Sequence, residues 1–144
     1  MTLIRGLKRE DEAAWRRLWA GYLVYYKTDL PAALTGALFE RLLIGQPHFA
    51  FVAIKDDEMI GFVHCLPHAS TWSIDDYCYL EDLYVDPAVR GSGAGRALIE
   101  AVDKEADRRG LPRVYWHTEN GNVTARHLYD KLATLSEFVQ YRRS

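Results

Sequence analysis

The stretch Val85-Asp-Pro-Ala-Val-Arg-Gly-Ser-Gly-Ala-Gly-Arg96 lies between a predicted strand and a predicted helix. Glycine occupies every second position from 91 to 95, which allows the backbone to approach a ligand closely. The helix that follows begins with unpaired amides and a partial positive charge, and two arginines flank the turn. The stretch therefore predicts a cradle for a pyrophosphate. The simpler alternative is an ordinary glycine-rich turn between a strand and a helix.

Three kinds of phosphate-binding turn compete for this stretch. A Walker loop requires Gly-Lys-Ser/Thr at its end, whereas here Gly95 is followed by Arg96 and Ala97. A dinucleotide-binding turn requires G-x-G-x-x-G, and here the third glycine comes one residue too early. The turn is similar to the Arg-x-x-Gly-x-Gly turn of acetyl-CoA-dependent transferases, with Arg90, Gly93 and Gly95 at the fixed positions.

Hydrophobic periodicity places the other elements around this turn. Apolar residues three and four apart predict helices, and alternating or branched apolar runs predict strands. We expect strands at residues 2–7, 49–54, 59–66, 77–85, 113–118 and 137–142, helices at residues 10–26, 31–44, 93–109 and 122–131, and a loop at residues 68–76.

The order of these elements predicts the fold class. The strand, turn, helix and strand between residues 77 and 118 form a right-handed crossover, so the two strands run parallel. The two strands before them are joined by a short polar tip at residues 55–58, which predicts an antiparallel hairpin. We therefore expect an α/β fold with a mixed central β-sheet flanked by helices on both faces, in a single domain of residues 1–144.

The composition excludes several classes of protein. The net charge of −2 is spread over mixed signs, which argues against a nucleic-acid partner. No apolar stretch approaches the roughly 20 residues of a membrane helix, and the charged opening is unlike a signal peptide. The two cysteines, Cys65 and Cys78, are too few for a metal cluster and too far apart for a CxxC pair. We expect a cytoplasmic protein without a metal or a membrane partner.

Two further stretches complete a resemblance that covers nearly the whole chain. Tyr79-Leu-Glu-Asp-Leu-Tyr-Val-Asp-Pro87 comes directly before the turn, and Asn122-Val-Thr-Ala-Arg-His-Leu-Tyr-Asp-Lys131 follows the next strand. Together with the turn, they resemble the GNAT superfamily of N-acetyltransferases. The first stretch is similar to the YLED strand of the spermidine/spermine acetyltransferases, and residues 71–86 and 114–116 resemble the fungal Hpa-type histone and polyamine acetyltransferases. The resemblance implies the GNAT-type acyl-CoA N-acyltransferase fold, acetyl-CoA as co-substrate and a homodimer.

The resemblance also implies roles for individual residues. The strand before the turn pairs with the pantetheine arm, and the amide of Val85 faces the thioester carbonyl as an oxyanion donor. The turn amides hold the pyrophosphate, Asn122 bonds the arm, and Tyr129 protonates the departing thiolate. The implied cofactor-binding residues are Leu83, Tyr84, Val85, Arg90, Gly91, Ser92, Gly93, Ala94, Gly95, Arg96 and Asn122.

Transfer to an amine requires a base, because an ammonium with a pKa of about 10 must lose a proton before it can attack. Glu81 is the predicted base, since two acids within an apolar strand are costly without a use. Its simpler interpretation is a structural ion pair. We expect Asp82 to bind a cationic substrate, although regular alternation points it away from Glu81 unless the strand contains a bulge.

Further residues are candidates for the acceptor side. Trp72, close to Asp75 and Asp76, suits a cationic amine through cation–π attraction. Tyr26 is expected to edge the substrate groove, together with Tyr22 and Tyr25 of the same, mostly buried aromatic stripe. His117 is an alternative base or proton relay, against its simpler interpretation as a packed strand residue.

The predicted reaction is acetyl transfer from acetyl-CoA to a primary amine by direct attack in a ternary complex. The acceptor is a small molecule or peptide: a polyamine, a lysine side chain or another cationic small amine. The alternative is a catalytically silent acyl-CoA-binding regulatory module, which would not need both Glu81 and Tyr129.

Overall fold

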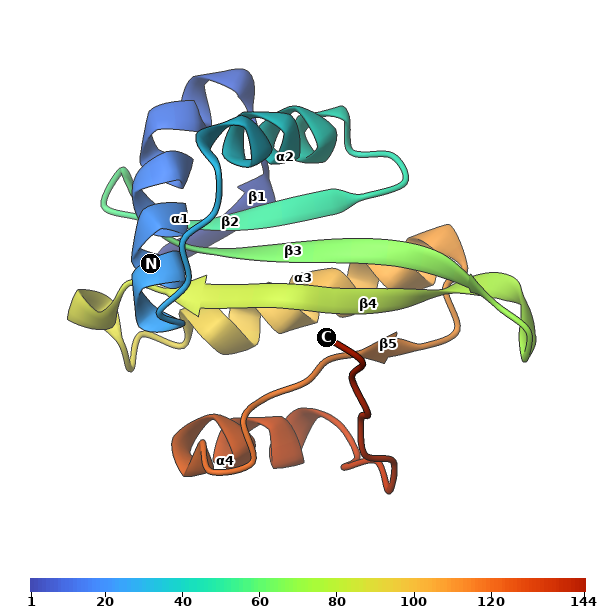
Figure 1. Ribbon diagram of the computed structural model, residues 1–144. Helices are drawn as coiled ribbons and strands as arrows, with labels where there is room; N and C mark the ends of the chain where they lie inside the picture. The colour runs from blue at the N-terminus through green and yellow to red at the C-terminus, as the bar shows by residue number, and fades with distance from the viewer.

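One five-stranded sheet, in the order β1-β2-β3-β4-β5, organises the molecule (Figure 1). The computed structural model describes residues 1–144. Its helices and strands are β1 (Thr2–Gly6), α1 (Glu12–Tyr25), α2 (Ala32–Ile44), β2 (Phe49–Lys55), β3 (Glu58–Ser70), β4 (Ser73–Val85), α3 (Ala94–Arg109), β5 (Val114–Tyr115) and α4 (Val123–Leu132). No helix is both long enough and apolar enough to span a membrane.

The sheet is mixed, as predicted. Neighbouring strands are antiparallel except β4 and β5, which are parallel and joined by α3. Side chains alternate between two faces along β2: Ala50 and Val52 pack with α1 and α2, whereas Phe49 and Ala53 pack with α3. Figure 1 shows α3 behind β3 and β4, with α4 below the sheet. Helices therefore cover both faces, which confirms the predicted fold class.

The predicted loop at residues 68–76 is wrong. β3 continues to Ser70 and β4 begins at Ser73, so this region is the end of a long hairpin with only two residues in its turn. His68 pairs with Tyr77, and Ser70 pairs with Ser73. Antiparallel pairing satisfies the backbone hydrogen-bonding groups of this region. Its polar side chains face solvent, which an antiparallel hairpin tolerates.

The C-terminal strands also differ from expectation. β5 contains two residues where six were predicted, and the expected closing strand at residues 137–142 does not form. Residues 134–144 make no backbone–backbone hydrogen bond, although Val139 and Tyr141 alternate with polar residues as in a strand. Alternation alone does not make a strand, because the segment has no neighbouring strand in this chain to pair with.

The entry to α1 is held by a buried carboxylate. Asp11 accepts two hydrogen bonds from the Arg5 guanidinium, at 2.7 and 3.0 Å, and a third from the backbone amide of Lys8 at 2.8 Å. The hydrogen bond from Arg5 is the largest cause that lowers the pKa of Asp11 below its usual value. The pair fixes β1 against the start of α1, the helix that carries Tyr22 and Tyr25 of the site described below.

We predict that Asp11→Asn lowers the free energy of unfolding by about 1.5–3 kcal/mol at neutral pH, because a hydrogen-bonded charge is lost. Since folding lowers the pKa of Asp11, its contribution is complete above the unfolded pKa of about 4 and is lost as the pH falls through the folded value. Urea unfolding at pH values above and below that window measures both effects.

The exposed ion pair between Arg9 and Glu40 is the matched control, with two contacts of 2.6 Å. Glu40→Gln is expected to cost clearly less stability than Asp11→Asn, because solvent screens the pair. An equal loss in the two variants would contradict the role given to Asp11.

Candidate active site

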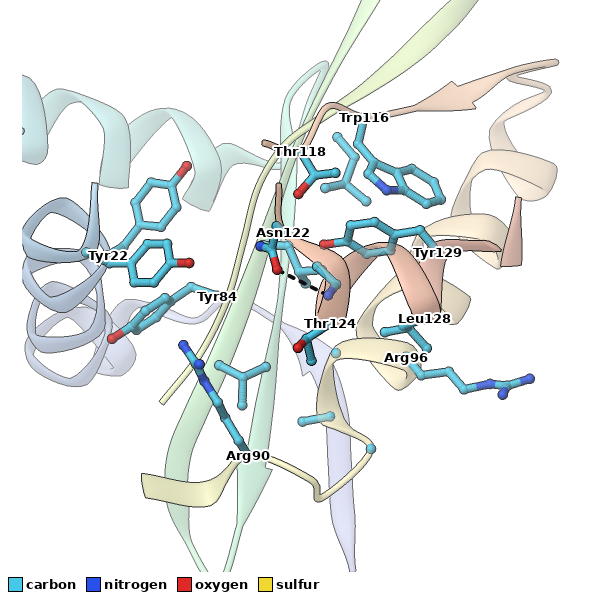
Figure 2. Close-up of a pocket in the computed structure, with 18 of the residues that line it drawn as sticks. Tyr22, Tyr84, Arg90, Arg96, Trp116, Thr118, Asn122, Thr124, Leu128 and Tyr129 are labelled. Carbon is cyan, nitrogen blue, oxygen red and sulfur yellow. Dashed lines mark hydrogen bonds between the residues drawn. The ribbon is translucent and has the colours of Figure 1, made fainter. Parts of the chain in front are cut away.

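A gap opens in the sheet beside the second half of β4. β5 pairs with β4 only at Cys78–Val114 and Tyr79–Tyr115, and β4 then continues to Val85 without a neighbour on that side. A cavity of about 530 Å³ occupies this position, within the range of small-ligand sites. Figure 2 shows Tyr22 and Tyr84 on one side of the cavity and Asn122, Thr124 and Tyr129 on the other.

One extra residue in β4 sets the geometry of the gap. His64 of β3 pairs with Asp82, and the next residue, Cys65, pairs with Leu80, so Glu81 has no partner. This is the bulge that the sequence required if both acids were to reach one site. Before the bulge, the amide of Cys78 points to the side of β4 on which β5 lies. It donates a hydrogen bond of 2.7 Å to the carbonyl oxygen of Arg113, the residue just before β5.

The bulge reverses the direction of the amides that follow it. The amide of Asp86 donates to Ile60 O on β3 at 2.7 Å. Because successive amides of a strand point to opposite sides, those of Leu83 and Val85 point away from β3 and toward the gap. The strand therefore offers the cavity two unpaired donors, at the positions expected to pair with the pantetheine arm.

The glycine-rich turn forms an anion cradle at one end of the cavity. Gly91 and Gly93 have φ angles of +86° and +79°, which favour glycine, and a Cβ at either would meet only open space. None of the backbone amides of residues 90–96 donates to another backbone group. The Ser92 hydroxyl is buried without a partner, and Arg90 and Arg96 line the cavity. These unsatisfied donors and cations fit a pyrophosphate.

Asn122 and Tyr129 line the cavity from α4, as their separation of two helical turns predicts. Asn122 Oδ1 accepts a hydrogen bond from the amide of Ala125 at 3.2 Å and caps the helix, while its side-chain nitrogen has no partner within the protein (Figure 2). Tyr129 packs edge-on against Trp116 at 5.5 Å. Burial is the main cause that raises the pKa of Tyr129, so its hydroxyl keeps a proton that it can donate.

Glu81 lines the same cavity from the bulge, and its carboxylate has no hydrogen-bond partner or cation beside it. It is therefore not part of a structural ion pair. The loss of surrounding water and, second, the negative charge of Asp82 raise the pKa of Glu81 above its usual value. A free carboxylate with increased proton affinity is suited to accept a proton.

The other sequence candidates fall into two groups. Tyr26 and His117 line the cavity, and His117 Nδ1 lies 3.2 Å from the Tyr79 hydroxyl. Asp82 does not line it: its carboxylate is held by the Tyr22 hydroxyl and by His64. Trp72 lies in the turn of the β3–β4 hairpin, 77% exposed and outside the cavity.

Tyr22 and Tyr25 also line the cavity, on the helical stripe whose tyrosines were expected to edge the substrate groove. Other lining residues were not indicated by the sequence. Thr118 and Thr124 flank the Asn122 segment and carry no recognisable signal. The structure brings together no group of three or more His, Cys, Asp or Glu residues that could hold a metal ion.

Known proteins resemble this chain in sequence and in architecture. The family model described as Acetyltransferase (GNAT) family matches residues 11–133. The chain belongs to the GNAT family. D-amino-acid N-acetyltransferase HPA3 of Saccharomyces cerevisiae is 35% identical over 99% of this chain and 90% of its own length. Aminoglycoside N(6')-acetyltransferase type 1 of Klebsiella aerogenes is 27% identical over 97% of this chain and 93% of its own.

A solved GNAT structure supports the fold. The aminoglycoside acetyltransferase AAC(6')-Iy, in complex with a bisubstrate analogue of CoA, matches with a TM-score of 0.84 and 21% identity, over 100% of this chain and 99% of that one. The protein is thus an acetyl-CoA-dependent N-acetyltransferase with a GNAT fold. This result favours an enzyme over a catalytically silent module.

We predict that Gly93→Glu abolishes acetyl-CoA binding, as measured by calorimetry. The side chain would occupy the open space above the turn, add a negative charge to an anion cradle and strain a left-handed residue.

Gly110→Glu is the matched control, because Gly110 ends the same helix with a φ of +74° and also faces open space. The Gly110→Glu variant has the same backbone strain of about 1–2 kcal/mol, because its new side chain also sits on a left-handed residue. This residue lies outside the cradle, so we expect the variant to bind acetyl-CoA with the affinity of the wild type. Unaltered binding in Gly93→Glu would refute the cradle assignment.

Proposed function

We propose that the enzyme transfers the acetyl group of acetyl-CoA to a primary amine of a small cationic molecule, by direct attack while both substrates are bound. The observation that carries this proposal is a single cavity that holds an unpaired carboxylate, Glu81, a protonated phenol, Tyr129, and an anion cradle. Cys65 and Cys78 are fully buried and do not line the cavity, so neither is placed to carry an acyl group.

Each group has one task in the reaction. Glu81 accepts a proton from the acceptor ammonium, and the neutral nitrogen forms a bond to the acetyl carbon as the carbon–sulfur bond breaks. The amide of Val85, directed toward the gap, stabilises the negative charge that develops on the carbonyl oxygen. Tyr129 donates its proton to the departing sulfur. The nitrogen loses a second proton as the amide forms, and this proton restores the Tyr129 phenol, while Glu81 releases its proton to solvent as the products leave. All these groups belong to this chain, and no step requires a metal ion.

The acceptor is proposed from the charge and aromatic content of the cavity. Glu81 is its only carboxylate, and the rings of Tyr22, Tyr25 and Tyr26 offer faces that attract an ammonium. The yeast relative is named for D-amino acids and the Klebsiella relative for aminoglycosides, and both classes are amines. A polyamine or a lysine side chain fits the same chemistry.

We also propose that the enzyme acts in the cytoplasm as a homodimer. Leu135, Phe138, Val139 and Tyr141 are 68–94% exposed in the unpaired C-terminal segment, an apolar surface that a second copy would cover.

A screen of acetyl-CoA consumption across amines tests the proposal, with spermidine, D- and L-amino acids, a lysine peptide and an aminoglycoside. Mass spectrometry is expected to find one acetyl group on a nitrogen of the product. Release of CoA by hydrolysis alone, with every amine unmodified, would contradict it.

We predict that Glu81→Gln lowers turnover by roughly 100-fold, because the amide keeps the shape but cannot accept a proton. The loss shrinks at high pH, where more of the amine is already neutral. In the wild type, turnover falls as the pH drops through the raised pKa of Glu81, since only the carboxylate is active.

The pH–rate profiles of the wild type and of Glu81→Gln measure this difference. The base assignment fails if the two profiles are parallel at every pH.

We further predict that Tyr129→Phe lowers turnover by roughly 10–100-fold while acetyl-CoA affinity stays close to that of the wild type. The hydroxyl is needed only as the thiolate leaves, so its loss affects the transition state. Steady-state rates and calorimetry separate the two quantities. Unchanged turnover at saturating substrate would make Tyr129 a packing residue and leave water as the acid.

A further inference from the structure

A chain of four hydrogen-bonded side chains leads from the core to the cavity wall. The Trp15 indole nitrogen lies 3.0 Å from His64 Nε2, and His64 Nδ1 lies 2.9 Å from Asp82 Oδ2. The Tyr22 hydroxyl lies 2.6 Å from Asp82 Oδ1. Trp15 and His64 are 0% and 1% exposed, and Tyr22 alone of the four lines the cavity.

The direction of each hydrogen bond in this chain follows from the chemistry of its first member. An indole nitrogen can only donate, so His64 Nε2 must accept and carries no proton. A neutral imidazole has one proton, which is therefore on Nδ1 and is donated to Asp82. His64 is thus neutral, and its contact with Asp82 is a hydrogen bond from an imidazole to a carboxylate.

The last member of the chain is fixed in the same way. The Tyr22 hydroxyl has a single proton, and the Asp82 carboxylate accepts it at 2.6 Å. Burial and the charge of Asp82 raise the pKa of Tyr22, so the proton is retained. The phenol oxygen then has only lone pairs for any other partner.

We propose that Tyr22 binds the acceptor amine as a hydrogen-bond acceptor, and that His64 and Asp82 are positioning residues that hold its hydroxyl proton away from the cavity. This inference rests on the proposed function, because it assigns the amine-binding group beside Glu81. Asp82 thereby acts on the substrate through Tyr22 and not by direct contact.

The arrangement selects the kind of group that binds at this point of the cavity. An ammonium or amine N–H can donate to the Tyr22 oxygen, whereas a carboxylate or carbonyl oxygen finds no donor there. A site rejects a ligand that leaves a hydrogen bond unmade more strongly than it rejects a ligand that differs only in size. The site therefore favours acceptors that present a nitrogen to Tyr22 and any carboxylate elsewhere.

Tyr22→Phe tests the binding role, because it removes the oxygen and keeps the ring. With spermidine, a D-amino acid and an aminoglycoside as probes, KM for the amine acetylated fastest is expected to rise roughly 10-fold, the loss of one hydrogen bond to a charged group. Turnover changes less than KM, and acetyl-CoA affinity stays constant. An unchanged KM overturns the inference.

Two amide variants of His64 test the positioning role. His64→Asn places an amide nitrogen near the Nδ1 position and keeps a donor to Asp82, whereas His64→Gln reaches the Nε2 position and keeps only the acceptor for Trp15. We expect His64→Gln to raise KM for the amine by several-fold and His64→Asn to restore most of that loss. Both variants are expected to lose similar thermal stability.

Equal rises in KM for the two variants, in proportion to their loss of stability, would show that His64 is a packing residue and overturn the positioning role.

The wild-type measurement separates this inference from the proposed function. An active wild type with an unaffected Tyr22→Phe contradicts the inference alone, and a wild type that acetylates no amine contradicts both.

Discussion

Glu81 has no partner on β3, and this one extra residue reverses the direction of every amide and side chain that follows it in β4. Leu80 packs in the core with α3 before the bulge, and Leu83 packs on the same side after it. Asp82 instead reaches α1, and Glu81 is left at the cavity wall. The bulge thus turns Asp82 to the face of the sheet that α1 covers, where Tyr22 and His64 hold its carboxylate, while the carboxylate of Glu81 stays free to accept a proton.

The site is built from groups that the fold leaves unsatisfied. The amides of Leu83 and Val85 face the gap, those of residues 90–96 bond to no backbone carbonyl, and the Ser92 hydroxyl has no partner. An unpaired buried polar group costs about 1–3 kcal/mol. These unpaired donors lower the stability of the free protein. A ligand that accepts hydrogen bonds from them removes this cost, which increases its affinity. Acetyl-CoA has a pyrophosphate that would fit the turn and amides that would fit the edge of the strand.

Local patterns in the sequence predicted the parts of the fold that depend on local chemistry. Periodicity located the four helices, and the left-handed glycines and the Asn122 cap stand where the turn and helix signals placed them. Features that depend on a distant partner could not be predicted. The strand at residues 137–142 needs a neighbouring strand, the bulge is a property of pairing with β3, and the fate of Asp82 depends on Tyr22, 60 residues away. His64 could have been suspected as a lone polar residue within an apolar run, but its partners could not be read from that run.

We infer that the unpaired edge of β4 after the bulge binds the pantetheine arm of the co-substrate. Amide hydrogen exchange, followed by NMR with and without CoA, tests this claim residue by residue. The amides of Leu83 and Val85 are expected to gain protection when CoA binds. Those of Tyr84 and Asp86, which face β3, are expected to be protected already and to change little. Equal protection of all four amides, or none at Leu83 and Val85, would contradict the account.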